Sequence, residues 1–180
     1  MCVHGFCGVA VRPEHLIGYG TDDHRIVRRA SLARSGTKPL VLGGVTVSRR
    51  HSPIAHSDGD VVYHAIANAL LLAAGEGDIG SRFPDTDPRW SGVPSYRFVI
   101  EALGIVSRRG YAVNNISVMI TAGEPRLSPY VERMRARIAD LLCIEKRRVG
   151  VGVTSGERLS AHALGKGINA TAAVLLRDTR

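Results

Sequence analysis

Two histidines and one aspartate have the side chains and the spacing of a metal site. Asp22 and His24 are separated by a single residue, so their side chains point to the same side if the segment is extended. His64 lies in a later segment with helical periodicity. Two imidazoles and a carboxylate suit Zn²⁺ with three protein ligands and one open position, as in catalytic zinc sites. By spacing alone, an exposed turn without a metal explains an Asp-x-His pair more often.

Two further segments carry groups suited to phosphate. Residues 154–157 follow an expected strand, and their hydroxyl and backbone N–H groups could hold phosphate oxygens. Glu157 could bind a hard cation such as Mg²⁺ through substrate phosphates. In the segment 123–127, Arg126 could bind an anion. Without other information, an ordinary strand exit and a proline-containing turn are the preferred interpretations.

Residues 61–74 are expected to form the buried helix that carries His64. Apolar residues recur there at i+4 spacing in two rows, Val61, Ala65, Ala69 and Ala73 in one and Val62, Ile66 and Leu70 in the other. Gly75 and Gly77 are expected to end this helix.

Polar residues precede the helix. Ser57 or Asp58 is the expected N-cap. Asp60 lies four residues before His64, so the two share a helix face and the carboxylate could orient the imidazole ring. A cap or a flanking acid is the simpler interpretation of Asp60.

The remaining pattern predicts an α+β fold. Strands are expected at 16–20, 39–47, 115–121, 148–154 and 167–176, and helices at 96–109 and from 128 or 129 to about 143. Residues 49–53 are expected to be a connector, and a basic loop is expected to reach about Lys38. This order favours a mixed β-sheet with helices packed on one face, a ferredoxin-like two-layer sandwich. Residues 1–15 form an N-terminal extension in this interpretation, and residues 16–180 a single domain.

Composition narrows the class of protein. The 44% of hydrophobic residues is typical of a globular domain, and the 5% of aromatic residues argues against a platform of rings that stack on nucleic-acid bases. A net charge of +8 favours anionic partners such as phosphorylated metabolites, nucleic acid or acidic surfaces. Three cysteines without a CxxC pair indicate a reducing compartment. No secretory signal and no membrane-spanning apolar run is recognised, so a cytoplasmic location is expected.

The chemistry-bearing segments occur together, and in this order, in one known family. From about residue 17 to 176 the chain resembles the 2-C-methyl-D-erythritol 2,4-cyclodiphosphate synthase family. The matching segments are GYGTDDHR at 18–25, LGGV at 42–45, AHSDGDVVYHAIANALL at 55–71, GDIGSRFPDTDP at 77–88, EPRLSP at 124–129 and VTSGERL at 153–159.

The resemblance implies a phosphorus–oxygen lyase of non-mevalonate isoprenoid biosynthesis. Such an enzyme converts 4-diphosphocytidyl-2-C-methyl-D-erythritol 2-phosphate into the 2,4-cyclodiphosphate and CMP, by attack of the substrate's own 2-phosphate on the β-phosphorus. The resemblance places Zn²⁺ at Asp22, His24 and His64, and a second ion, Mg²⁺ or Mn²⁺, at Glu157. It also implies a homotrimer with active sites between neighbouring subunits. From the composition, no membrane partner is expected, and nucleic acid is disfavoured as a partner.

Substrate-contacting residues follow from the same resemblance. His56 and Ser155 match residues that stabilise the transition state. The sugar-phosphate side is expected to comprise His56, Ser57, Asp78, Ile79 and Gly80, with a closing loop of Phe83, Pro84, Asp85, Thr86 and Asp87. The nucleotide side is expected to comprise Ala122, Pro125, Arg126, Leu127 and Ser128, and the diphosphate turn Thr154, Ser155, Gly156 and Glu157.

Departures from the family pattern concentrate on the nucleotide side. Glu124 adds negative charge there, Ser155-Gly156 replaces threonines, and Leu164 stands where an arginine is frequent, so that Arg158 or Lys166 would have to replace it. A phenylalanine frequent near Ala161 is also missing. These changes keep open a related metal-dependent enzyme with altered nucleotide specificity. A basic, non-catalytic nucleic-acid-binding protein is the alternative of another class, but it does not explain the retained acids and histidines.

Overall fold

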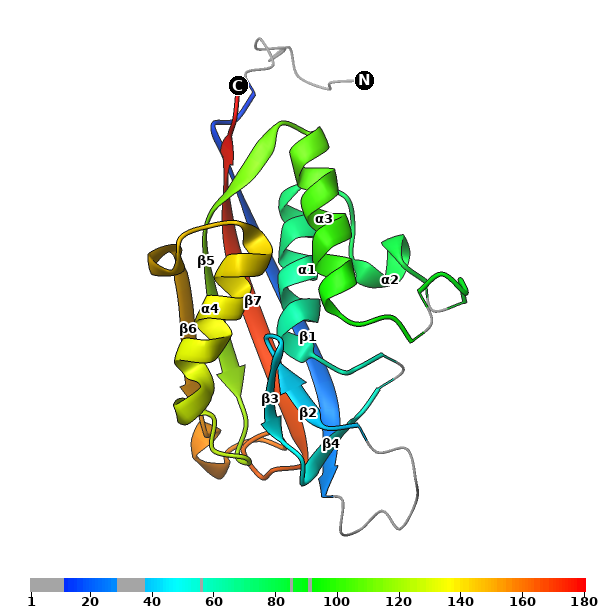
Figure 1. Ribbon diagram of the computed structural model, residues 1–180, viewed down its shortest axis with the longest axis vertical. Coiled ribbons are helices and arrows are strands. Elements are labelled where there is room, and N and C mark those ends of the chain that lie inside the picture. The colour runs from blue at the N-terminus through cyan, green and yellow to red at the C-terminus, as the bar shows by residue number, and fades with distance from the viewer. Residues whose placement is uncertain (1–11, 29–37, 56, 85, 91) are drawn as a thin grey trace, which may run out of the picture.

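A twisted, five-stranded mixed sheet runs the length of the molecule (Figure 1). The computed structural model describes residues 12–28, 38–55, 57–84, 86–90 and 92–180. The sheet has the strand order β4-β1-β7-β5-β6, and only the β5–β6 pair is parallel. Its strands are β1 (His15–Arg28), β4 (His51–Ile54), β5 (Tyr111–Thr121), β6 (Val149–Thr154) and β7 (Gly167–Asp178).

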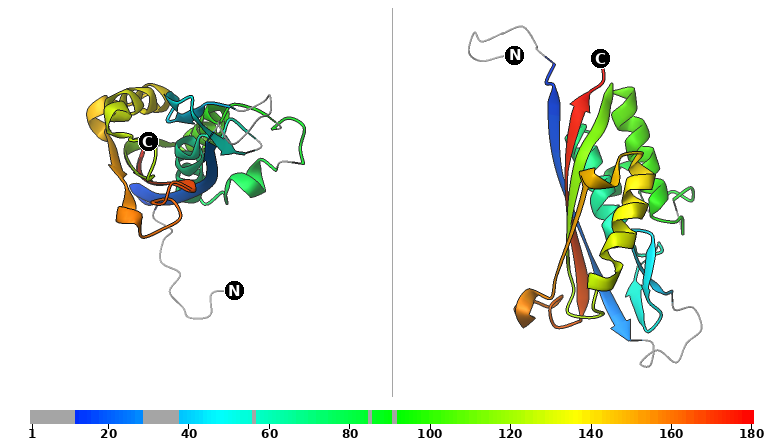
Figure 2. Two further views of the ribbon diagram at one scale, coloured as in Figure 1. Left: turned by 90° about the horizontal axis from the view of Figure 1, so that it is seen from below. Right: turned by 60° about the vertical axis from the view of Figure 1, so that its left-hand side comes forward.

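The helices lie on one face of this sheet (Figure 2). They are α1 (Val61–Ala73), the short α2 (Ile79–Arg82), α3 (Tyr96–Arg108) and α4 (Val131–Leu142). The buried apolar residues of α1, α3 and α4 form one core with the inner face of the sheet. The expected α+β class with a mixed sheet is confirmed. No helix in the described part of the chain has the length and apolar character needed to cross a bilayer.

The order of elements is not ferredoxin-like. A ferredoxin-like domain follows the order β-α-β-β-α-β, whereas here α4 joins the parallel neighbours β5 and β6, and β7 follows β6 without an α-helix between them. A parallel pair needs a long crossover connection, which α4 supplies. Spacing along the chain predicted the helices but not which strands would pair.

Three strand predictions are corrected by the pairing. β1 continues through Asp22 and His24, far beyond the expected end at residue 20, because β7 pairs with it from His15 to Arg25. The expected strand at 39–47 is a hairpin of β2 (Leu40–Leu42) and β3 (Val45–Ser48). Gly43 and Gly44, both at positive φ, make its turn. The expected connector at 49–53 contains β4, which pairs with the end of β1.

The N-terminus of α1 is capped by Asp60, not by Ser57 or Asp58. The Asp60 carboxylate accepts hydrogen bonds from the backbone N–H groups of Val62 and Tyr63 and, across the core, from those of Gly43 and Gly44. It therefore fixes the β2–β3 turn to the start of α1. Asp60 is fully buried, and this burial raises its pKa to about 6 although the N–H groups of Gly43, Gly44 and Tyr63 favour the ionised form.

Contact between α1 and β1 is made by main-chain atoms. Even-numbered residues of β1 face the helices, and two of them, Gly18 and Gly20, have no side chain. A Cβ at Gly18 would lie 1.9 Å from the Ala69 carbonyl oxygen, and one at Gly20 would lie 2.3 Å from that of Ala65. The helix can approach the strand this closely only because both positions are glycine. The next even-numbered residues after Gly20 are Asp22 and His24.

The outer face of the sheet is exposed and partly apolar. Ile17, Tyr19 and Met119 are exposed by 77%, 61% and 48%. Ile17 and Tyr19 alternate with Gly18 and Gly20 along β1, so they point away from the helices. Neighbouring exposed apolar side chains on a regular sheet are a feature of surfaces that meet another protein.

Candidate active site

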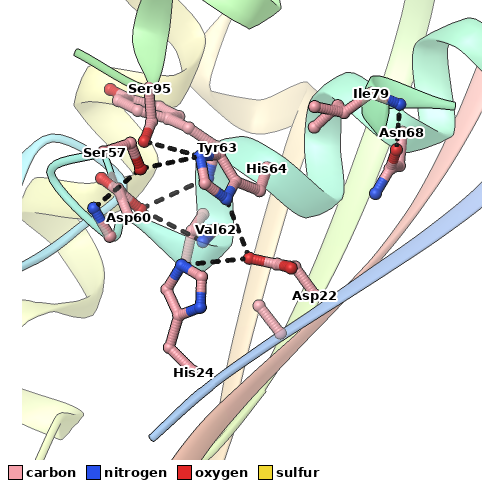
Figure 3. Close-up of polar contacts among 12 residues, drawn as sticks. Asp22, His24, Ser57, Asp60, Val62, Tyr63, His64, Asn68, Ile79 and Ser95 are labelled. Carbon is pink, nitrogen blue, oxygen red and sulfur yellow. Dashed lines mark hydrogen bonds and ion pairs between the residues drawn. The ribbon is translucent and has the colours of Figure 1, made fainter. Parts of the chain in front are cut away.

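Asp22, His24 and His64 converge between β1 and α1 (Figure 3). The Asp22 Oδ2 atom lies 2.9 Å from His64 Nδ1 and 3.5 Å from His24 Nε2. One ligand atom of each residue falls within 4.8 Å of the others, the separation expected of groups around a single ion. Asp22 and His24 lie in a strand, which is the condition under which both side chains were expected on one side, and the helix that carries His64 faces them.

The chemical state of these groups fits a divalent metal ion. His24 Nε2 is buried and has no hydrogen-bond partner among the described residues. Burial lowers the pKa of His24 and outweighs the opposing effect of Asp22, while His64 lowers it further. The ring therefore stays neutral over a wider pH range, and a neutral imidazole is the form that binds metal. Two nitrogens and one carboxylate oxygen are ligands that Zn²⁺ accepts.

The second ring nitrogen of His64 contacts two serines. Nε2 lies 2.9 Å from Ser95 Oγ and 3.3 Å from Ser57 Oγ. The Asp60 carboxylate accepts hydrogen bonds from backbone N–H groups and makes none with the His64 ring. The cap interpretation of Asp60 is thus confirmed, and the alternative that it orients the His64 ring is wrong.

A cavity of about 500 Å³ adjoins the metal ligands, and the residues that line it are His24, Ala55, Ser57, His64, Ile79, Gly80, Phe83, Trp90, Gly92 and Phe98. Ser57, Ile79, Gly80 and Phe83 were predicted for the sugar-phosphate side. Asn68 of α1 helps to place them, because it bonds the backbone of both Thr21 and Ile79.

Other residues predicted for this side do not line the cavity. Asp78 caps α2 through the backbone N–H of Ser81. Asp87 pairs with Arg89 at the surface, and Pro84 and Thr86 are also outside the lining. His56 and Asp85 lie outside the described residues.

The cavity has an aromatic wall of Phe83, Trp90 and Phe98, and sequence reasoning missed Trp90 and Phe98 as cavity residues. The ring centroids of Phe83 and Trp90 are 4.7 Å apart, and Phe98 lies 5.5 Å from Phe83 and 5.6 Å from His64. Trp90 is the only tryptophan of the chain, in a segment rich in turn residues. That isolated large residue in a loop was the available signal. Phe98 lies in α3, a helix that was expected at 96–109.

The two phosphate-suited segments meet in a second cavity, of about 300 Å³. It is lined by Ala122, Gly123, Arg126, Leu127, Ser128, Val153, Thr154 and Ser155. The predicted nucleotide and diphosphate segments are therefore neighbours, since β5 and β6 end side by side. Pro125, Gly156 and Glu157 are not part of this lining, and Glu157 is exposed.

A third cavity, of about 260 Å³, contains several departures from the family pattern. Its lining is Gly123, Glu124, Ser155, Arg158, Ala163, Leu164 and Gly165. Glu124 pairs with Arg28 at the end of β1, and its carboxylate lies 3.7 Å from His51 Nε2. The Arg28 guanidinium lowers the pKa of Glu124, so the extra acid stays charged and is neutralised by its partner. Arg158 and Leu164 both line this cavity.

Together the fold and the site define a class: α+β proteins in which a mixed sheet and one helix hold an Asp-His-His group suited to a divalent metal. The sequence model of the YgbB family matches residues 15–177, and the chain belongs to this family. It is 40% identical over 161 residues to 2-C-methyl-D-erythritol 2,4-cyclodiphosphate synthase of Bacillus licheniformis, covering 89% of this chain and 97% of that protein. For the synthase of Geobacillus kaustophilus the identity is 42% over 163 residues, covering 91% and 98%.

Solved structures support the same assignment. A 2C-methyl-D-erythritol-2,4-cyclodiphosphate synthase in its CDP-bound form has a TM-score of 0.79 and 38% identity to this chain. The match covers 89% of this chain and 99% of the other. The relative therefore shares the fold over nearly its full length, and it binds a cytidine nucleotide.

Proposed function

We propose that this protein is a 2-C-methyl-D-erythritol 2,4-cyclodiphosphate synthase that releases CMP from 4-diphosphocytidyl-2-C-methyl-D-erythritol 2-phosphate. The proposal rests on the convergence of Asp22, His24 and His64 beside a cavity that Ser57 and Gly80 also line. Full-length relatives of about 40% identity carry this name. They favour the enzyme over a non-catalytic nucleic-acid-binding protein.

The reaction needs positioning and charge neutralisation. An oxygen of the substrate's 2-phosphate forms a bond to the β-phosphorus, while the bond from that phosphorus to the CMP oxygen breaks. Zn²⁺ held by Asp22, His24 and His64 would supply a Lewis acid for the β-phosphate oxygens. The hydroxyls of Thr154 and Ser155 donate hydrogen bonds to the diphosphate, which orients it for in-line attack.

We assign the remaining predicted roles to the two sides of the substrate. His56 and Ser57 hold the phosphate of the sugar alcohol, and the aromatic wall excludes water from it. Arg126 and Ser128 bind the nucleotide, and Glu157 would hold Mg²⁺ or Mn²⁺, which would neutralise charge on the diphosphate.

A homotrimer with shared active sites is part of the proposal. In the described part of the chain, the cavity beside His24 and His64 shares no lining residue with either of the two nucleotide-side cavities. The exposed apolar residues Ile17, Tyr19 and Met119 offer a contact surface. Sedimentation equilibrium should give three times the mass of one 19.3 kDa chain. A monomer active at low concentration would contradict shared sites.

CMP release is the decisive assay. The purified protein, loaded with Zn²⁺ and Mg²⁺, is incubated with the cytidine substrate, and nucleotide products are separated by chromatography. We expect CMP and the cyclic diphosphate in equal amounts, and no reaction after chelation. The same assay with the uridine and adenosine analogues tests altered nucleotide specificity. Failure to release any nucleotide would overturn the proposed function.

Glu157→Gln is expected to raise the Mg²⁺ concentration needed for half-maximal rate by about 10-fold or more, because an amide is a weaker ligand than a carboxylate. The rate at saturating Mg²⁺ should fall less. Titration of the CMP-release rate with Mg²⁺ measures both quantities. Glu145→Gln is the matched control, since Glu145 pairs with Arg147 on the surface. Identical Mg²⁺ curves for Glu157→Gln and wild type would remove the second metal from Glu157.

A further inference from the structure

His64 is held at both ring nitrogens by different elements. Nδ1 faces Asp22 of β1 at 2.9 Å, and Nε2 faces Ser95, directly before α3, also at 2.9 Å. A neutral imidazole carries a single N–H, so one nitrogen donates and the other offers a lone pair. Nδ1 points into the group of metal ligands. Metal coordination by this atom requires the proton on Nε2.

Ser95 is placed to accept that proton's hydrogen bond. It is fully buried, and its hydroxyl also bonds Asp58 Oδ1. The Ser95 backbone N–H donates to Asp58 Oδ2 at 3.1 Å. An ionised carboxylate only accepts hydrogen bonds, so the single Ser95 hydroxyl proton goes to Asp58. The oxygen of Ser95 is then left to accept from His64 Nε2–H.

The competing partner of Nε2 is less well placed. Ser57 Oγ lies 3.3 Å away and already accepts from the Gly59 N–H at 3.1 Å. Ser57 also lines the cavity, whereas Ser95 is fully buried behind the metal ligands. Ser95 is therefore the partner that stays in place when the cavity fills.

Ser95 also lacks the helix-capping hydrogen bond that its position favours. It is the residue before the first turn of α3, where a serine hydroxyl usually accepts from the N–H groups of that turn. Here it makes no such bond to α3. A local rule broken at a buried polar residue is expected where the side chain serves a site.

We propose that Asp58 and Ser95 are positioning residues that fix the His64 tautomer, with the proton on Nε2, and so make Nδ1 the metal-binding atom. The hydrogen-bond chain Asp58–Ser95–His64 acts through His64 and does not touch the substrate. It rests on the metal site of the proposed function. Groups that orient a metal-binding histidine typically contribute about 10–100-fold to metal affinity.

Metal affinity in the absence of substrate tests the hydrogen-bond chain. Zn²⁺ and Co²⁺ are titrated into wild type, Ser95→Ala, Asp58→Ala and the double variant in competition with a chromophoric chelator. Each single variant should bind about 10–100-fold more weakly, with shifted visible Co²⁺ absorption bands. The double variant should lose little more than either single one, because the two residues act as a unit. Ser95→Thr keeps the hydroxyl and should restore most of the affinity.

A stability control separates positioning from folding. Val99→Ala creates a small cavity in the buried face of α3 without touching the hydrogen-bond chain, so it should lower Tm but not metal affinity. Nitrogen-15 NMR of the zinc-loaded wild type should find His64 protonated at Nε2. Coordination through Nε2, or wild-type metal affinity in Ser95→Ala, would overturn this inference and leave the proposed metal site standing. A wild-type protein that binds no metal would instead remove the metal site, and the inference with it.

Discussion

Replacing His64 by alanine is expected to abolish stoichiometric metal binding and to lower CMP release by about 10²–10³-fold or more, the usual cost of losing a principal electrostatic stabiliser. After the change only Asp22 and His24 remain as possible ligands. Two ligands from one strand are expected to bind zinc weakly, because catalytic zinc sites use three protein ligands. Alanine is the best helix former and the side chain sits at the edge of the core. The protein should therefore stay folded, so the loss is chemical.

Metal content and activity have to be measured on the same samples. Dialysed His64→Ala protein is analysed for zinc by mass spectrometry and then assayed for CMP. His15→Ala is the matched control, because His15 lies at the exposed start of β1. One equivalent of tightly bound zinc in His64→Ala would mean that the Asp22, His24 and His64 group is not the metal site.

The largest expected loss of stability follows from Asp60→Ala. The substitution leaves the N–H groups of Gly43, Gly44, Val62 and Tyr63 without their acceptor in a buried place. Each buried unsatisfied group costs about 1–3 kcal/mol, and water entry recovers part of this. We expect the free energy of unfolding to fall by about 3–5 kcal/mol, measured by urea denaturation. An exposed cap elsewhere, such as Asp78→Ala at α2, should cost about 1 kcal/mol or less.

Asp60 should also make stability depend on pH in an unusual direction. Its pKa is raised to about 6 in the folded protein, chiefly by burial and secondarily by the nearby Asp58. Between the unfolded value near 3.8 and 6, the folded state binds more protons than the unfolded state. Stability from this group therefore increases as pH falls through 6. The difference in unfolding free energy between wild type and Asp60→Asn should be larger at pH 5 than at pH 7; the opposite trend would contradict the raised pKa.

Local periodicity was enough for α1, α3 and α4, but not for the short α2 or for the strands around Asp22, His24 and His64. The i+4 rows of α1 are short-range, so the helix that carries His64 was predicted from neighbours in sequence. The extension of β1 through Asp22 and His24 was not, because those residues are polar and only pairing with β7 makes them strand. The Gly43-Gly44 turn was present in the sequence as a hairpin signal, and it was read as part of one strand.

The grouping of Asp22, His24 and His64 could be predicted from the sequence, whereas the groups that contact them could not. Asp22 and His24 share a side by strand geometry, His64 was added from its place in a periodic helix, and the resemblance pointed to the same three residues. Ser95 and Asp58 are 37 residues apart, and no periodicity connects them. The pairing of Arg28 with Glu124 likewise joins segments 96 residues apart. Such contacts depend on how the helices and strands pack against one another. Periodicity over neighbouring residues in the sequence does not predict this packing.

The glycine contact between β1 and α1 has a thermodynamic consequence for metal binding. Because backbone atoms set the distance at Gly18 and Gly20, that distance does not depend on side-chain rotamers. The backbone contact therefore places His64 opposite Asp22 and His24, and few rotatable bonds would have to be frozen on metal binding. The conformational entropy lost on binding is correspondingly small, so more of the ligand–metal interaction is retained as affinity.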